Sequence, residues 1–347
     1  RAVTPGVSFS YLVRLQNRGP SPVGDLVLIE NLADSRPPLE AFRSLRFPTY
    51  RGFWRLTRAR QVADIPAAVV PDIAAGRESS TRIQAHALKR GVLHFEAITI
   101  GRPDSFGLFR SFAKVTAPEN LLVLPRRYAL PPLALPGSRK YQVGGVSLAS
   151  SVGDSEEFMG LRDYRPGDPL QRVHWKSYAR IGRPVVKEYQ DEFFERHALV
   201  LDTFGEERAS AALEEAVSVA ASFAYTIDTQ ECLLDLLFVG DAPCSYTAGR
   251  GQLQPLALLE ALAGAQLRPN GGFAVLREAL MARRATLTSS ILVLIGWDEQ
   301  RRQLVHELRV MGLPLLVMAV LNEPPADAPA WLQVLVPGRV KEGLARL

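Results

Sequence analysis

The hydrophobic pattern changes character partway along the 347-residue chain, and this change constrains the fold more than any other feature. Up to about residue 124, apolar residues recur in short alternating runs such as Val7–Gln16, separated by Gly, Pro and Asn. Short strands at such spacing predict a β-sandwich. From about residue 196, short apolar runs alternate with segments of helical periodicity. This second pattern predicts a mostly parallel, doubly wound sheet covered by helices on both faces.

The expected elements follow from the same periodicities. In the first half we expect strands at Val7–Gln16, Gly24–Glu30, Thr81–Leu88, His94–Ile100, Phe109–Val115 and Asn120–Leu124. Asn31–Ser80 carries weaker signals, and we expect a long irregular insertion there. In the second half we expect strands at Ala198–Leu201, Cys232–Val239, Ser290–Ile295, Leu313–Leu321 and Trp331–Val336. Helices are expected at Arg208–Asp228, Leu253–Ala263, Phe273–Ala282 and Glu299–Val310.

These patterns divide the chain into three segments. We expect a β-sandwich-like domain over residues 1–124 and an α/β domain over residues 196–347. Between them, residues 125–195 are expected to form a linker and a signature segment that packs onto the second domain. The connection is placed at Leu124–Gly137, because its four prolines cannot lie inside a sheet or a helix.

Composition and charge narrow the setting. Hydrophobic residues make up 47% of the chain, enough to form buried cores, and the net charge of +5 favours an acidic partner or an anionic surface. Two cysteines, Cys232 and Cys244, are too few for a disulfide framework, which favours a reducing compartment. No apolar run approaches the roughly 18 residues needed to cross a bilayer. The sequence begins at Arg1 without a methionine, so we expect any membrane anchor to lie upstream.

The densest polar chemistry lies in Phe158–Tyr189. Within it we expect a helix that starts after the turn Arg165–Asp168 and ends at Gly182. Asp168 is the expected N-cap, followed by Pro169 at the first helical position and Gln171 at the capping-box position. Leu170, Val173, Ser177 or Tyr178, and Ile181 are expected to form its buried stripe.

Arg172, Lys176 and Arg180 are spaced four residues apart and would form a basic stripe on another face of that helix. Two interpretations stay open. The stripe either pairs with carboxylates of the same chain or docks an acidic partner. The candidate carboxylates are Glu188, Asp191, Glu192 and Glu195.

The motifs of this segment resemble the signature of a known family. They read Gly153-Asp154-Ser155-Glu156-Glu157-Phe158, then Leu161-Arg162-Asp163-Tyr164-Arg165-Pro166-Gly167-Asp168-Pro169, then Arg172-Val173-His174-Trp175-Lys176-Ser177-Tyr178-Ala179-Arg180. This pattern is similar to that of the bacterial Domain of Unknown Function 58 family. Arg90–Val92, Asp104–Phe109 (with Ser105 where proline is usual) and Gly249–Ala263 resemble further motifs of the same family.

The resemblance implies a fold, a partner and a location. Members usually have two closely spaced transmembrane helices, a β domain and then a von Willebrand factor A-like domain, and they are associated with MoxR-type AAA+ ATPases. Because the sequence shows no catalytic motif, we expect a non-catalytic, membrane-tethered adaptor that engages such an ATPase or its client protein through the α/β domain. The region is expected on the cytoplasmic side of the inner membrane, with the anchor upstream of Arg1. The expected partner-binding residues are Arg162, Asp163, Tyr164, Gly167, Asp168, Arg172, His174, Trp175, Lys176 and Arg180.

Von Willebrand factor A-like domains often bind Mg²⁺ after the first strand through Asp-x-Ser-x-Ser, because a hard cation needs several oxygen ligands. Here Phe204 and Glu206 stand at the two serine positions after Asp202, and Asp298 is about two residues out of register. We therefore expect no cofactor, and we expect Asp202 to bond loop amides. The alternative is a divalent-metal-dependent ligand-binding domain that uses Asp202, Thr203, Glu206 and Asp298.

Two further functions are compatible with the sequence. A hydrolase-like enzyme could use His174 with Asp163 or Asp168, but no nucleophile elbow accompanies them. Arginines interleaved with aromatic residues between Phe42 and Arg60 could bind an anionic membrane surface or, failing that, lie solvated on a long loop. Those arginines are Arg43, Arg46, Arg51, Arg55 and Arg58. No nucleic-acid partner is expected, because no segment resembles a recognition fold.

Overall fold

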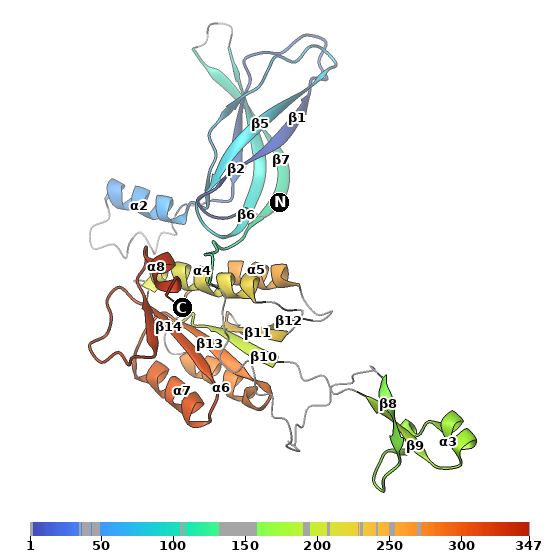
Figure 1. Cartoon of the computed structure of the whole chain (residues 1–347). Helices are drawn as coiled ribbons and strands as arrows, with labels where there is room; N and C mark the ends of the chain where they lie inside the picture. The colour runs from blue at the N-terminus through green and yellow to red at the C-terminus, as the bar shows by residue number, and fades with distance from the viewer. Residues whose placement is uncertain are drawn as a thin grey trace.

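The computed structural model places two antiparallel sheets in the first half of the chain and a mostly parallel sheet in the second (Figure 1). The residues that it describes are 3–34, 36, 43, 49–104, 106, 108–131, 158–189, 195–206, 209–227, 229, 232–240, 242–249, 254–268 and 272–346. No helix among these residues combines the length and the apolar character required to cross a bilayer.

The β half consists of two sheets that share a core. The first sheet has the order β1 (Ser8–Gln16), β5 (Glu78–Ala87) and β3 (Ala63–Asp64). The second has the order β4 (Ala68–Val69), β2 (Val27–Leu32), β6 (Gly91–Pro103) and β7 (Arg110–Val123). Alternation along the strands turns one apolar face of each sheet inward, so that Val13 and Ile83 of the first pack with Leu28 of the second.

Two expectations for this half were wrong. The two strands expected at Phe109–Val115 and Asn120–Leu124 are one strand, β7, whose pairing with β6 shifts register between Phe95 and Ala97. Pro118 fits within β7 because this strand lies at the edge of its sheet. The stretch expected to be irregular contains a helix, α2 (Tyr50–Arg60), whose N-cap Thr49 accepts a hydrogen bond from the N–H of Gly52.

The α/β half has a six-stranded sheet that is parallel except at one edge. Its order is β12 (Pro243–Ala248), β11 (Cys232–Val239), β10 (Glu195–Leu201), β13 (Ser289–Leu294), β14 (Leu315–Val320) and β15 (Leu332–Leu335), with β12 antiparallel. One face is covered by α4 (Ser210–Thr226), α5 (Pro255–Ala263) and α8 (Val340–Leu344), and the other by α6 (Phe273–Met281) and α7 (Glu299–Val310).

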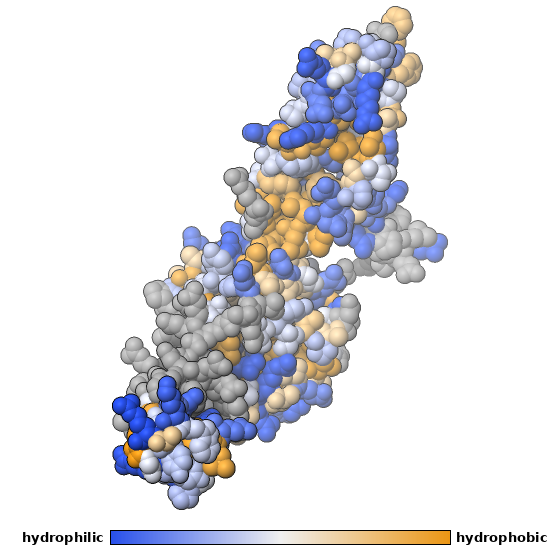
Figure 2. All heavy atoms as spheres, turned by 90° about the vertical axis from the view of Figure 1, so that its right-hand side faces the viewer, coloured by the Kyte–Doolittle hydropathy of each residue, from blue (hydrophilic) through white to orange (hydrophobic). Residues whose placement is uncertain are grey.

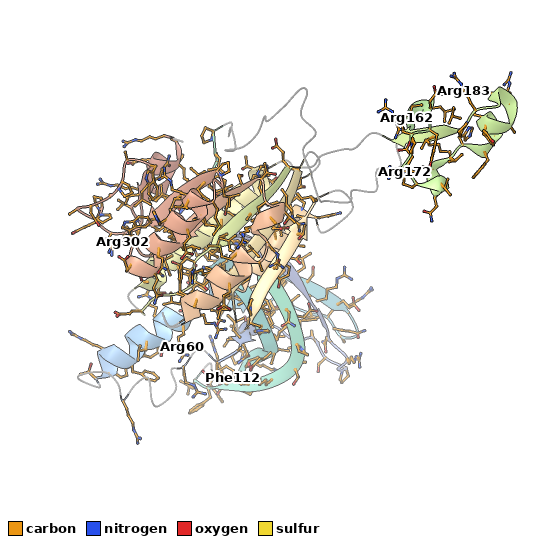
Figure 3. The ribbon with its side chains drawn as sticks, turned by 90° about the horizontal axis from the view of Figure 1, so that it is seen from below. Arg60, Phe112, Arg162, Arg172, Arg183 and Arg302 are labelled. Carbon is orange, nitrogen blue, oxygen red and sulfur yellow. The ribbon has the colours of Figure 1, made fainter. Side chains whose placement is uncertain are left out.

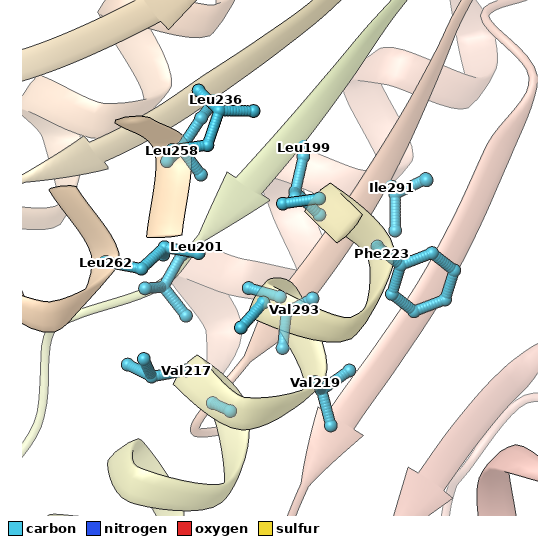
Figure 4. Close-up of a cluster of buried hydrophobic side chains, with 14 of the residues drawn as sticks. Leu199, Leu201, Val217, Val219, Phe223, Leu236, Leu258, Leu262, Ile291 and Val293 are labelled. Carbon is cyan, nitrogen blue, oxygen red and sulfur yellow. The ribbon is translucent and has the colours of Figure 1, made fainter. Parts of the chain in front are cut away.

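The core of this half is apolar on both sheet faces because the parallel strands are covered on each side. Leu199, Leu201 and Val293 point from the sheet toward α4 and α5, where Val217 and Phe223 meet them (Figure 4). Sequence periodicity predicted Cys232–Val239 and Glu299–Val310 with the observed bounds, but it missed β12 and α8.

The β half rests on the helical layer formed by α4 and α5 (Figure 1). The side chain of Arg90, at the start of β6, donates to the Ala265 carbonyl across 2.6 Å and pairs with the Glu214 carboxylate of α4. After β7, the Tyr128 N–H donates to Ser222 Oγ at 2.8 Å. The proline-rich connection is therefore bonded to the second domain over its described residues.

Along the sequence, a small unit of residues 158–189 separates the two halves, and we call it the signature unit. Strands β8 (Phe158–Asp163) and β9 (Val185–Tyr189) form an antiparallel pair. A short 3₁₀ turn, Leu170–Arg172, and helix α3 (Trp175–Ile181) connect them. Its expected packing onto the α/β domain stays a prediction.

Candidate functional site

The end of β10 carries the first candidate site, because the carboxyl ends of parallel strands are the usual binding edge of such sheets. Asp202 and Thr203, directly after β10, are fully buried. One carboxylate oxygen of Asp202 accepts from the Phe204 N–H at 2.9 Å, and the other accepts from the Ile295 N–H at 3.1 Å. Asp202 thus bonds loop amides, as predicted.

A guanidinium group lies at this carboxylate. Arg301, in the first turn of α7, donates from Nε to Asp202 at 2.6 Å and pairs through Nη1 with the Asp298 carboxylate. Its Nη2 donates to the Phe204 carbonyl at 2.5 Å. The Arg301 side chain is only 3% exposed, so its charge is almost completely shielded from water. Burial raises the pKa of the Asp202 carboxyl, whereas Arg301 and the two backbone amides act in the opposite direction.

The expected metal ligands serve other contacts in this arrangement. Thr203 Oγ1 donates to the Val239 carbonyl at 2.8 Å, and Glu206 is exposed. Asp298 is the N-cap of α7, where its carboxylate accepts from the Arg301 N–H at 3.0 Å. Phe204, at a serine position of the metal motif, is buried against Phe273. Among the described residues, no group of three or more His, Cys, Asp or Glu side chains is arranged to hold a metal.

Sequence reasoning missed Arg301. The available signal was its position three residues after a helix-capping aspartate, which places the side chain near both the cap and the strand ends. Nothing in the sequence states that the side chain turns inward rather than into solvent. That choice depends on the space left by Gly296, where an added Cβ would lie 3.1 Å from Arg301 Cζ.

The signature unit is the second candidate site, and Asp168 organises its turn. The Arg162 guanidinium binds the Asp168 carboxylate with two hydrogen bonds, of 2.7 and 2.8 Å, and the Arg165 N–H adds a third at 2.8 Å. These bonds lower the pKa of Asp168 to about 2, chiefly through Arg162. The turn also requires Gly167, which has a φ of +107°. Tyr164 is held by its backbone, whose N–H donates to the Pro184 carbonyl at 3.0 Å.

The single helix expected after this turn is wrong. Asp168 does not cap a helix through its side chain, and the 3₁₀ turn ends before α3 begins. The reason is tertiary: the His174 N–H donates to the Val185 carbonyl of β9 at 2.9 Å, and Val173 forms a bridge with Val186. These contacts draw Val173 out of helical geometry. The C-terminal end of the helix was predicted correctly. Gly182 is its C-cap and adopts a φ of +76°, a conformation that favours glycine.

The expected buried stripe is also wrong. Only Val173 of that set is buried, whereas Leu170 is 66% and Ile181 53% exposed. Trp175 is 61% exposed and contacts the Tyr178 ring edge-on, with the centroids 6.0 Å apart. Apolar side chains therefore lie on the surface of this unit.

The basic residues do not form one helical stripe. Arg172 (labelled in Figure 3) lies in the 3₁₀ turn, and Lys176 and Arg180 lie in α3, although all three are exposed. Of the carboxylates proposed to neutralise them, Glu195 contacts His197 Nε2 at 3.3 Å instead. The Glu188 side chain, Asp191 and Glu192 fall outside the described residues.

The carboxylates expected to assist His174 bind arginines. Asp163 contacts Arg183 at 3.3 Å, and Asp168 contacts Arg162. His174 itself lies with Nδ1 2.7 Å from Ser177 Oγ. The structure thus brings together His174 and Ser177, a pair that no motif in the sequence indicates.

The arginines expected at an anionic surface are partly described. Arg51 and Arg58 are exposed on α2, and Arg43 is exposed before it. Arg46 and the side chain of Arg55 fall outside the described residues.

Comparison with known proteins finds similarity over the part of the chain that contains both candidate sites. Residues 160–329 match the family described as protein of unknown function DUF58, so the match includes both candidate sites. The uncharacterized protein YeaD of Bacillus subtilis (strain 168) is 29% identical over 142 residues, which cover 40% of this chain and 33% of that protein. The match thus spans about a third of the length of the curated relative. Over residues 160–329, the chain is thus similar to the DUF58 family.

Proposed function

We propose that the chain is a non-catalytic adaptor that binds a partner protein through the signature unit. The observation that carries this proposal is the exposure of Leu170, Trp175 and Ile181 on a unit too small to have a core of its own. An isolated strand pair with one short helix buries little apolar area and is marginal in water. Such a surface is typical of a contact that another protein surface covers.

The charges around these side chains indicate the kind of partner. Arg172, Lys176 and Arg180 are exposed beside Trp175. In Figure 2, where the unit faces the viewer, hydrophobic and hydrophilic side chains lie side by side on its surface. Exposed tryptophan beside basic residues favours an acidic partner with an apolar pocket, since tryptophan and arginine contribute disproportionately to binding energy.

We further propose that the second domain is von Willebrand factor A-like and that the first is a β-sandwich. Support comes from the parallel sheet with helices on both faces and from the core shared by the two antiparallel sheets. On this proposal the partner is a MoxR-type AAA+ ATPase or its client. The full-length protein would be tethered to the inner membrane, with this region on the cytoplasmic side.

A pull-down tests the adaptor proposal. The full chain would be immobilised and incubated with a purified MoxR-type ATPase of the source bacterium. Changing Arg172, Lys176 and Arg180 to Glu is expected to reduce recovery about tenfold or more, because opposite charges would then repel. The matched control changes Arg14, Arg77 and Arg82 to Glu, three exposed residues of the β half.

A second variant, Trp175→Ser, separates two uses of the exposed surface. If the unit binds a partner, this variant loses recovery and keeps its melting temperature. If the unit instead packs onto the α/β domain of its own chain, the melting temperature falls and recovery stays. Full recovery with both the charge-reversed variant and Trp175→Ser would remove the signature unit from the proposal.

A hydrolase is the alternative that one contact favours. Ser177 Oγ lies within proton-transfer distance of His174 Nδ1, so a hydroxyl nucleophile and a base stand side by side. The binding of Asp163 and Asp168 by arginines weighs against it, because no third group then orients His174. Ester hydrolysis that is lost in both Ser177→Ala and His174→Ala would replace the adaptor proposal with this one.

We also propose an anionic membrane surface as a partner of α2. This helix contains no acidic residue, and Arg51 and Arg58 are exposed together with Tyr50 and Trp54. Aromatic and basic side chains on one helix are typical of interfacial binding. Sedimentation with vesicles containing anionic lipid, but not with neutral vesicles, is expected for the wild type and is expected to be lost when Arg51 and Arg58 are changed to Glu. Equal binding of single-stranded RNA would contradict a lipid-specific surface.

A further inference from the structure

A von Willebrand factor A-like domain is expected to hold a divalent cation where β10 ends, but the residues present at that position do not fit one. An octahedral Mg²⁺ site needs about six oxygen ligands. Both oxygens of Asp202 already accept hydrogen bonds, and the Thr203 hydroxyl is directed to the Val239 carbonyl. The Phe204 side chain, which stands at a serine position, lies in the core.

We propose that the Arg301 guanidinium is the cation of this site, supplied by the protein itself. It sits against the two carboxylates, Asp202 and Asp298, that a metal would otherwise use. Its third nitrogen donates to the Phe204 carbonyl, a further oxygen of the same loop. Each nitrogen of the guanidinium therefore contacts a separate oxygen acceptor, and the planar fork matches this arrangement.

The surroundings are shaped to this side chain. The Arg301 guanidinium carbon lies 5.0 Å from the centre of the Phe273 ring, so the aromatic face adds a cation–π contact. At Gly296 an added Cβ would stand 3.1 to 3.2 Å from three guanidinium atoms, closer than most real Cβ contacts. A glycine at this place therefore leaves the room that the guanidinium fills.

This arrangement changes how the edge of the sheet can bind a partner. A metal ion can offer a free coordination position to an acidic ligand, whereas a guanidinium that is 3% exposed cannot reach one. Arg301 is also covalently part of α7, so it links α7 to the loop after β10 and cannot be removed by a chelator. We therefore expect the domain to fold without Mg²⁺ or Mn²⁺.

Thermal unfolding of the full chain tests this inference, because any ion that binds the native state must raise the melting temperature. The wild type is expected to melt at the same temperature in EDTA, in millimolar Mg²⁺ and in millimolar Mn²⁺. A rise of several degrees with either metal would show that a metal binds the native chain and would overturn the inference. This result is independent of the adaptor proposal, since it requires no partner.

A double-mutant cycle tests the charge pairing. Arg301→Gln and Asp202→Asn are each expected to lower the melting temperature, and the double variant is expected to lower it by clearly less than the sum, because the two charges compensate each other. Additive shifts would contradict the pairing.

Should Arg301→Gln fail to fold, Gly296→Ala tests the same contact by filling the space beside the guanidinium. It is expected to destabilise by displacing the guanidinium, whereas Gly160→Ala, whose added Cβ meets no atom within 4 Å, is the matched control. An unchanged melting temperature in Gly296→Ala would refute the fit.

Discussion

Arg90 is expected to hold the two halves of the chain together, and replacing it with methionine tests this. Methionine retains an unbranched apolar side chain and removes the charge. The Arg90 side chain is 5% exposed and contacts the Ala265 carbonyl and the Glu214 carboxylate, both in the α/β half. Burial lowers the pKa of its guanidinium, while Glu214 opposes that shift.

The contacts set the size of the effect. Loss of the hydrogen bond from the charged group to the Ala265 carbonyl costs about 1.5–3 kcal/mol. Loss of the pair with Glu214 adds about 0–1 kcal/mol, because that carboxylate is 53% exposed and water can replace the guanidinium. Arg90 Nε has no hydrogen-bond partner among the described residues, so its removal returns part of this cost. The net loss of coupling is about 1–2 kcal/mol.

Differential scanning calorimetry measures this coupling, because two linked domains melt together and uncoupled domains melt separately. Arg90→Met is expected to lower the transition of the less stable half by roughly 2–8 °C and to separate it from the other transition. Glu214→Gln is the matched control and is expected to shift it much less. A single transition at the wild-type temperature in Arg90→Met would refute the reasoning.

Three further outcomes are expected. Asp235→Asn is expected to lower the free energy of unfolding, measured with urea, by about 2–4 kcal/mol. Asp235 is fully buried and binds the Arg196 guanidinium at 2.8 Å, so the change leaves that guanidinium without its counter-charge. A decrease below about 0.5 kcal/mol would contradict this. Burial lowers the pKa of His197, with Glu195 opposing, so the unfolded state takes up protons first and stability is expected to fall as the pH drops below about 6.5. Melting curves at several pH values check this, and the same slope in His197→Asn would argue against it. Gly182→Ala is expected to lower the free energy of unfolding by about 1 kcal/mol, because this C-cap position has a positive φ. The same change is expected to speed amide hydrogen exchange in α3, and unchanged exchange would count against it.

The α/β half was largely predictable from sequence, for a physical reason. Its strands are buried on both faces and its helices present one apolar face, so their periodicities are strong, as in α7. β12 and α8 were missed because their patterns are weak. β12 is the antiparallel edge strand of the sheet, and its exposed and half-buried residues form no continuous apolar run.

The signature unit shows where the same reasoning fails. The spacing of Leu170, Val173 and Ile181 fits a helix, but the contact between His174 and Val185 breaks that helix in two. The competing strand lies more than ten residues away along the chain, so no local pattern reports it. Gly182 was predicted correctly because a helix C-cap with positive φ is a local requirement that glycine meets.

By itself the sequence determined most of the strands and helices of the α/β half, the absence of the serine ligands after β10, and the resemblance of residues 160–329 to the DUF58 family. Each of these depends on residue types at short spacing. Only the tertiary structure decided that Arg301 turns inward onto Asp202, ninety-nine residues earlier in the chain. That contact exists because helix α7 begins beside the end of strand β10 and Gly296 leaves space for the guanidinium, and both are consequences of packing rather than of local pattern.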